Sequence, residues 1–408
     1  MAKFHNICSR QFDAYKCSEY AQIDTAVSNV LNILVTRRKS KGKRVRYNKA
    51  LLKHIKVILL DLYVASEETA YCGQRRASKW IAISRSKGAY GRVTRYDTIN
   101  LSYRHIIGVL RDLKDGGYIR QKIGFFDRRT RTGKQSRIRA TAKLLACFRL
   151  AGANTAMVGR FADETIVLRD KDKKLQDYVD TADTKTWRAN LNAINLAIAN
   201  RWITLYLTDS KLRQLEIDMA RDPERGQLDL NRVHLKRVFN NGTFNEGGRF
   251  YGGWWQNIPK QYRQYIEIDF KGTREVDYSG LHIRMLYAMC NVQAPADPYY
   301  TAGIPREVQK TAMMILINAN SAQSAINGLR KQAISNPREV LSAVARDHPK
   351  IASYFYSGIG IKLQFLDSCI AEQVLLATIK KGGIALPVHD SFIVRIGRER
   401  ELQADMEA

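Results

Sequence analysis

The chain has 408 residues, of which 45% are hydrophobic, and its 67 Lys and Arg outnumber its 39 Asp and Glu. This length predicts two or three domains, and the net charge of +28 indicates a polyanionic partner, most simply nucleic acid. The six cysteines form no CxxC pair, and neither a signal peptide nor a charge-free apolar stretch is present. The composition therefore argues against a zinc knuckle, a disulfide framework and a membrane span. We expect a cytoplasmic protein, associated with the nucleoid if its source is a bacterium or a phage.

Residues 1–49 are expected to form a helical N-terminal segment followed by a basic arm. The first 34 residues have a helical pattern, and the stretch from Thr36 to Lys49 then places eight Lys or Arg in fourteen positions. Such a run is either a solvated linker or an arm that neutralises phosphates, and one segment can serve as both.

Residues 50–150 have the element order of a winged helix-turn-helix domain. A mostly apolar stretch over residues 51–66, interrupted by charges, predicts an amphipathic helix. A second helix begins at Ser102, carries its apolar residues on one face and ends at a Gly-Gly pair. A strand over residues 118–126, a basic loop and another strand follow.

In this arrangement the helix from Ser102 lies in a major groove, and the basic loop is the wing, which contacts phosphates or a minor groove. The order resembles the winged-helix modules of replication initiators and regulators. The alternative is a helical subdomain with a basic hairpin. The expected DNA contacts are Tyr103, Arg104, Arg128, Arg129, Arg131, Lys134 and Arg137.

Residues 151–245 carry charged runs and then one long amphipathic stretch. We expect helices with solvated faces and no chemistry of their own. The residue types that suggest chemistry therefore fall in the last part of the chain, residues 246–408.

Two aspartates are expected at the tips of neighbouring strands. Val276 and Asp277 read as the end of a strand that precedes an apolar helix, and Asp390 lies at the tip of a hairpin over residues 386–394. Either aspartate alone is equally well explained as a cap or a turn residue. As a pair they can hold two Mg²⁺ ions, with Mn²⁺ as a substitute, in the geometry that activates a 3′-hydroxyl and stabilises a leaving pyrophosphate.

A helix between the two aspartates is expected to present cations on one face. Arg306, Lys310 and Met314 recur at i, i+4 and i+8, so they share a face. Such a face can bind a triphosphate, because its cations neutralise charge on the leaving phosphates. The alternative is an ordinary amphipathic helix with two surface cations.

The stretch GGRFYGGWWQNIP, residues 247–259, combines glycines with residues suited to nucleic acid. Arg249 can contact a phosphate or a minor groove, aromatic rings can stack, and Gln256 and Asn257 can read minor-groove acceptors. The alternative is a glycine-rich loop packed by its tryptophans.

Together these pieces resemble the family A DNA polymerases and the phage single-subunit RNA polymerases. DYSGLHIR is similar to the first catalytic motif, RxxxKxxxM to the fingers-helix motif and VHDSF to the third motif, while GRFYGGWWQNIP is similar to the segment that touches the primer–template. The pieces occur in the family's order, and the resemblance covers roughly residues 245–396.

The resemblance implies an α+β fold: a right-hand polymerase palm over residues 246–408 with helical fingers, a helical thumb-like region over 151–245, and the winged helix-turn-helix domain before them. It implies that Asp277 and Asp390 are the catalytic metal ligands. The implied nucleotide-binding residues are His282, Arg306, Lys310, Met314 and Asn318, and the implied primer–template contacts are Arg249, Gln256, Asn257 and His389.

The sequence departs from the family at two places that concern sugar choice. His282 stands where the DNA polymerases carry Glu and the phage RNA polymerases carry Gly, and Asn318-Ala319 replaces the fingers Tyr-Gly pair. The aspartates are also only 390 − 277 = 113 positions apart, a shorter interval than is usual.

The expected function is template-directed DNA synthesis, which adds dNMP to a primer 3′-hydroxyl and releases pyrophosphate. The expected partners are a DNA template, a primer and nucleoside triphosphates. A membrane is not expected as a partner. The closest alternative is RNA synthesis, as a primase or small RNA polymerase. A further alternative is a non-catalytic replication initiator that keeps the palm only as a scaffold.

Overall fold

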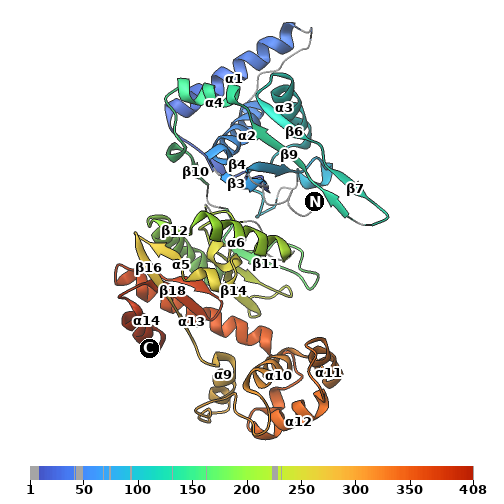
Figure 1. Cartoon of the computed structure of the whole chain (residues 1–408), viewed down its shortest axis with the longest axis vertical. Coiled ribbons are helices and arrows are strands. Elements are labelled where there is room, and N and C mark those ends of the chain that lie inside the picture. The colour runs from blue at the N-terminus through green and yellow to red at the C-terminus, as the bar shows by residue number, and fades with distance from the viewer. Residues whose placement is uncertain are drawn as a thin grey trace. The chain divides into compact units, whose positions relative to one another are not determined.

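The computed structural model describes residues 9–40, 42, 49–67, 69–72, 75–91, 94–130, 132–161, 163–222, 228–230 and 232–407. It is a mixed α+β structure, about half helical, with several small sheets (Figure 1). Two compact units are present. The first comprises Met1–Glu164 and Leu207–Asp229, and the second comprises Thr165–Tyr206 and Leu230–Ala408. Because of this arrangement the backbone passes between the units three times.

The first unit is built around a helix that is buried on nearly all sides. This helix, α2 (Lys49–Glu67), buries every residue from His54 to Ala65 except Lys56. The prediction of an amphipathic helix was therefore wrong for this part of α2. Its charged Asp61 is fully buried and is neutralised by Arg10 at 2.7 Å, as a buried carboxylate requires. The other helices of this unit are α1 (Ala21–Ser40), α3 (Tyr103–Asp115), α4 (Ala142–Leu150) and α6 (Asp209–Arg221).

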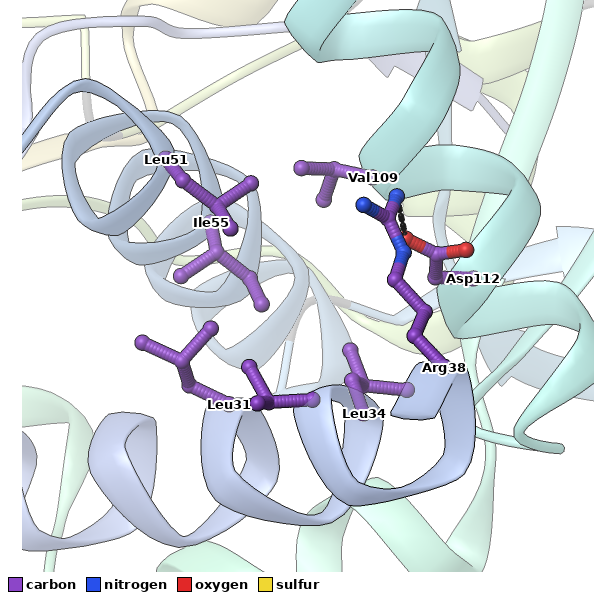
Figure 2. A pocket seen from close by; sticks show the side chains of 8 residues that line it. Leu31, Leu34, Arg38, Leu51, Ile55, Val109 and Asp112 are labelled. Carbon is purple, nitrogen blue, oxygen red and sulfur yellow. Dashed lines mark hydrogen bonds and ion pairs between the residues drawn. The ribbon is translucent and has the colours of Figure 1, made fainter. Parts of the chain in front are cut away.

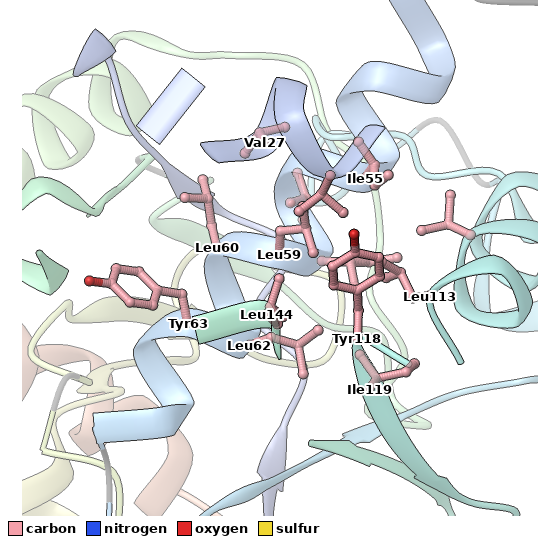
Figure 3. Packing of buried hydrophobic residues seen from close by; sticks show 14 of the residues in the cluster. Val27, Ile55, Leu59, Leu60, Leu62, Tyr63, Leu113, Tyr118, Ile119 and Leu144 are labelled. Atoms are coloured by element: carbon pink, nitrogen blue, oxygen red, sulfur yellow. The ribbon is translucent and has the colours of Figure 1, made fainter. Parts of the chain in front are cut away.

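Figure 3 shows part of the apolar core that joins α1, α2, α3 and α4 to the sheet of the first unit. Tyr118 and Ile119 enter it from the start of a strand, and Leu113 enters it from α3. The apolar face predicted for α3 is confirmed, since Leu101, Ile106, Val109, Leu110 and Leu113 are all buried.

A small apolar hollow lies between α1, α2 and α3 in the same unit (Figure 2). Leu31 and Leu34 line it from α1, Ile55 from α2 and Val109 from α3, and an ion pair between Arg38 and Asp112 borders it.

The predicted basic arm is only partly described. Its residues 36–40 belong to α1 and residue 49 to α2, while residues 41 and 43–48 lie outside the described part of the chain.

The main sheet of the first unit has the order β1-β5-β9-β6. Strand β1 (Ser9–Gln11) is parallel to β5 (Trp80–Ile83), and β9 (Ser136–Ala140) is antiparallel to both β5 and β6 (Ile119–Lys122). Smaller pairs are β2 (Lys16–Cys17) with β10 (Gly159–Arg160), β3 (Thr69–Cys72) with β4 (Arg75–Ser78), and β7 (Phe125–Asp127) with β8 (Thr132–Lys134). The prediction that residues 1–34 are helical was wrong over β1 and β2, and the single strand predicted over 118–126 is divided into β6 and β7.

The second unit contains two sheets. One has the order β11 (Ile166–Leu168), β13 (Lys236–Phe239), β14 (Gly247–Tyr251). The other has the order β12 (Ile203–Leu205), β15 (Ile266–Ile268), β16 (Lys271–Asp277), β18 (Ser391–Arg395), β17 (Leu386–Val388). The region predicted to be helical over 151–245 therefore contributes strands to both sheets.

The helices of the second unit form two groups, one that accompanies the sheets and one that forms a cluster of its own. Helices α5 (Ala182–Ala199), α7 (Trp254–Asn257), α8 (Lys260–Arg263), α13 (Gly360–Lys380) and α14 (Glu399–Glu407) accompany the strands, and α13 packs against β14. A second apolar core joins α9 (Leu281–Met289), α10 (Arg306–Asn318), α11 (Ala322–Lys331) and α12 (Pro337–Asp347). Short 3₁₀ helices occur at Lys87–Ala89, Thr155–Met157 and Ala352–Tyr354. Within the ranges described above, no helix has both the length and the apolar character to span a bilayer.

Candidate functional site

The two predicted carboxylates lie at the same end of two adjacent strands. Strand β16 ends at Asp277, which is paired with Ser391 at the start of β18. Asp390 immediately precedes that serine, in the turn between β17 and β18, and its carbonyl oxygen accepts a hydrogen bond of 3.3 Å from the Tyr278 N–H. The strand end and the hairpin predicted from the sequence are both confirmed.

The electrostatics of this strand end favour a bound cation. Two effects raise the pKa of Asp277 to about 6: desolvation, which is the larger, and repulsion from Asp390. The residue nevertheless remains exposed to solvent. A cation shared by the two carboxylates would remove this repulsion. In the described part of the chain no three His, Cys, Asp or Glu side chains gather as a metal cluster. Two carboxylates are a donor set that would fit Mg²⁺, which is often bound by one or two carboxylates and completed by water and phosphate oxygens.

His389 occupies a strained position beside this pair. Val388 pairs with Ser391, so the hairpin turn consists of His389 and Asp390 alone. The backbone of His389 has φ +60°, in the left-handed region that glycine adopts at no steric cost. Its imidazole meets the ring of Tyr251 edge-on, with the centroids 5.9 Å apart. Strain of this kind is often retained where a side chain is needed for function.

The segment predicted to touch a primer–template forms hydrogen bonds to β17, the first strand of the β17–β18 hairpin. The Gln256 amide donates to the carbonyl oxygens of Phe250 and Pro387, both at 2.9 Å, and the Trp255 indole N–H also donates to Pro387, at 3.1 Å. Trp254 and Trp255 are fully buried, so they pack the loop and offer no stacking face to a ligand. A duplex contact by Gln256, or by Asn257 at the end of α7, stays a prediction.

Arg249 and His282 meet at a buried carboxylate that the sequence analysis missed. Asp367 of α13 is 3% exposed, and it accepts hydrogen bonds from Arg249 Nε at 2.9 Å and from His282 Nε2 at 2.8 Å. Arg249 Nη2 lies 3.2 Å from the same imidazole nitrogen. Asp367 is 118 positions from Arg249 and 85 from His282, so no local pattern could have connected them.

Helix α10 presents the predicted face to solvent. Arg306 and Met314 are exposed, whereas Ala312 and Met313 are buried in the apolar core shared with α9, α11 and α12. Arg306 makes two hydrogen bonds to Asp297, at 3.2 and 3.3 Å, and Lys310 contacts Glu307 at 3.0 Å. Ion pairs this exposed contribute little stability, so a polyanion can displace their carboxylates at small cost.

Tyr299, which no sequence pattern singles out, lies near both this helix face and the carboxylate pair. Desolvation and then the charges of Asp390 and Asp277 raise the pKa of its hydroxyl, against the opposing effect of Arg306. The ring lies under both α10 cations, 5.4 Å from Arg306 and 5.9 Å from the Lys310 amine. Tyr299 therefore lies close both to the carboxylate pair and to the α10 cations.

Asn318 lies where α10 meets the start of α13. Its amide donates to the Met314 carbonyl oxygen at 2.8 Å, and a Cβ at Gly360 would come within 2.1 Å of its Oδ1. The two helices therefore approach closely here, and a side chain at residue 360 would require the Asn318 amide to move. A direct role of Asn318 with nucleotide stays a prediction.

In the first unit, cations face each other across two strands. Arg120 on β6 is directly opposite Arg139 on β9, and Lys122 is opposite Arg137. Like charges in such pairs are destabilising unless an anion lies between them. The Lys122 amine and the Arg139 guanidinium also approach the Trp80 ring, at 5.1 and 4.6 Å.

The remaining predicted DNA contacts of this unit are distributed over three elements. Tyr103 and Arg104 begin α3, Lys134 ends β8, and Arg128 and Arg129 are exposed in the turn between β7 and β8. Arg131 lies outside the described residues. Comparison of the chain with protein-family models, with curated proteins and with solved structures finds no match.

Proposed function

We propose that the protein is a template-directed nucleotidyltransferase, and that its preferred reaction is DNA synthesis. The carrying observation is the pair Asp277 and Asp390 at the ends of adjacent strands, joined through Tyr299 to the cations of α10. A metal-binding carboxylate pair and a cationic helix face are the two components that transfer of a nucleotide from a triphosphate requires.

The proposed roles follow from where each side chain lies. Asp277 and Asp390 hold divalent cations, which when bound lower the barrier for attack of a hydroxyl on the α-phosphate and for departure of pyrophosphate. Arg306 and Lys310 exchange their surface carboxylates for the triphosphate. His282, held by Asp367, lies on the first turn of α9, shortly after Asp277, and contacts the incoming sugar.

The finer fold belongs to the same proposal. The sheet of β16, β17 and β18 is the palm, and the cluster of α9 to α12 is the fingers. In the first unit, the order α2, β5, α3, β6, β9 with a basic hairpin before β9 is that of a winged helix, and it supports duplex DNA as the template. The opposed cation pairs of β6 and β9 support the same partner.

Primer extension with single substitutions tests the catalytic assignment. Asp277→Asn and Asp390→Asn preserve shape but remove a metal-binding charge, so Mg²⁺-dependent extension should fall by about 10³-fold or more while DNA binding is kept. Asp172→Asn, which changes an exposed aspartate of the same unit, is the matched control. Extension near the wild-type rate by either active-site variant would rule out the assignment.

A further inference from the structure

The β7–β8 hairpin of the first unit is a two-stranded antiparallel ribbon. Its strands are in register, with Phe125 opposite Lys134 and Phe126 opposite Gly133. Asp127 fixes the turn by accepting hydrogen bonds from the Arg129 N–H at 2.9 Å and the Thr130 hydroxyl at 2.8 Å. Figure 1 shows the ribbon, labelled at β7, extending away from the helices of its unit.

This ribbon exposes large apolar side chains on both of its faces. Phe125 is 62% exposed, Phe126 is 67% exposed, and Ile123 just before them is 62% exposed. Successive strand residues point to opposite faces, so each face carries a phenyl ring. The Phe126 ring lies over Gly133, where an added Cβ would come within 2.9 Å of it. Grouped apolar side chains of this size on a surface indicate a binding site.

The charges around the rings select the partner. Exposed Arg128 and Arg129 form the tip of the ribbon, and Lys134 lies beside Phe125. The opposed cations of β6 and β9 adjoin its base. Asp127, the one acidic side chain in the described part of the ribbon, is occupied by the turn. Apolar rings bordered by cations are complementary to stacked bases bordered by phosphates.

We propose that this hairpin is a wedge that inserts Phe125 and Phe126 into the base stack of duplex DNA and opens the duplex locally. Apolar side chains inserted at a base step unstack it, and rings on both faces of one ribbon can each stack on an exposed base. The flanking arginines hold the backbone while the stack opens. The proposal rests on the DNA-binding part of the proposed function and is independent of nucleotidyl transfer.

Two synthetic probes test the wedge with the full-length protein. One is a short, fully paired duplex, and the other is the same duplex with a central bubble of unpaired bases and 2-aminopurine at the bubble edge. The wild-type protein should bind the bubble about tenfold more tightly than the paired duplex, because no free energy is spent on unpairing its bases. The 2-aminopurine fluorescence should rise on binding.

Substitution of both rings should remove this preference. In a Phe125→Ala, Phe126→Ala double variant the two affinities should agree within about twofold and the fluorescence rise should disappear, while low-salt binding to the paired duplex is kept. The corresponding Tyr double variant keeps flat rings and should restore the preference. Phe161→Ala, at another exposed phenylalanine of the same unit, should leave it unchanged.

The arginines at the tip should act differently from the rings. An Arg128→Ser, Arg129→Ser double variant should bind both probes less tightly by the same factor, with a salt slope that is flatter by about 1.8. The wedge would be overturned if the double Ala variant bound the bubble over the paired duplex as strongly as the wild type does. It would also be overturned if the wild type itself showed no preference for the bubble. A ring-dependent change of oligomeric state without loss of bubble preference would instead assign the ribbon to contact with a second copy. Failure of the wild type to bind paired DNA at low salt would overturn the DNA-binding assignment itself.

Discussion

Asp367 shows how one buried side chain can determine the behaviour of two others. It accepts hydrogen bonds from both Arg249 and His282, and Arg249 in turn lies close enough to Asp390 for that charge to raise its pKa. A buried carboxylate with two cationic or polar partners fixes their positions more firmly than solvent would. Asp367 therefore acts as a positioning residue for the proposed sugar contact of His282.

Sugar selection should respond to His282 and Asp367 together. If the imidazole crowds a 2′-hydroxyl, His282→Gly should raise the ratio of kcat/KM for rNTP to that for dNTP by up to about 10²-fold. Asp367→Asn should shift the same ratio in the same direction, because the imidazole loses its fixed position. The measurement is matched-nucleotide incorporation by both single variants and the double variant.

Coupling separates this role from a general loss of structure. Because both substitutions release the same imidazole, the double variant should shift the ratio no further than His282→Gly alone. Independent, additive shifts would contradict the coupling. A wild-type enzyme that prefers rNTP would show that RNA synthesis is the correct reaction.

At the scale of elements, the β17–β18 hairpin combines local strain with chemistry. Its two-residue turn has His389 at the position that favours glycine, and Gln256 and Trp255 hold the strand that leads into it. These contacts maintain a backbone conformation that a histidine adopts only at a cost of about 1–2 kcal/mol.

Relief of this strain should stabilise the protein and impair its activity. His389→Gly should raise the free energy of unfolding by up to about 1 kcal/mol, since the strain relieved exceeds the added entropy of the unfolded chain. Primer extension should slow at the same time, because the variant loses the imidazole that the resemblance to polymerases places at the primer end. His389→Ala is the matched control: it removes the imidazole but keeps a Cβ in the left-handed region. Equal stabilities of the Gly and Ala variants in denaturant melts would contradict the strain argument.

The elements that could be predicted from sequence are those with a local pattern. The i, i+4, i+8 spacing of Arg306, Lys310 and Met314 identified the exposed face of α10, and apolar runs interrupted at Asp277 and Asp390 identified the strand end and the turn. Burial of α2 could not be predicted, because Lys53, Lys56 and Asp61 suggest a solvated face. Asp61 is instead paired with Arg10, a residue 51 positions away. Tyr299 and Asp367 were missed for the same reason, since long-range pairing leaves no periodic trace.

At the scale of the whole molecule, the proposed DNA-binding cations and the carboxylate pair lie in different parts of the chain. The opposed cation pairs and the basic hairpin belong to the first unit, whereas the carboxylate pair belongs to the second. Within the proposed function, the first unit therefore supplies the salt-dependent affinity for DNA and the second supplies the reaction. Length and composition anticipated more than one domain, but not that the first unit is discontinuous.

This discontinuity means that no single backbone cut can release one unit from the other. After cleavage at a protease site engineered between Glu164 and Thr165, residues 207–229 would still belong to the first unit while covalently joined to the second on both sides. Their contacts include a hydrogen bond of 2.6 Å from the Lys79 amine to the Leu228 carbonyl oxygen. The cleaved protein should give two bands on a denaturing gel but elute as one species from a sizing column and bind DNA as before. Fragments that separate without denaturant would contradict this. If they remain together, the same position is the place to divide the chain into two co-expressed polypeptides, and their reassembly would give split, conditionally active versions of the protein.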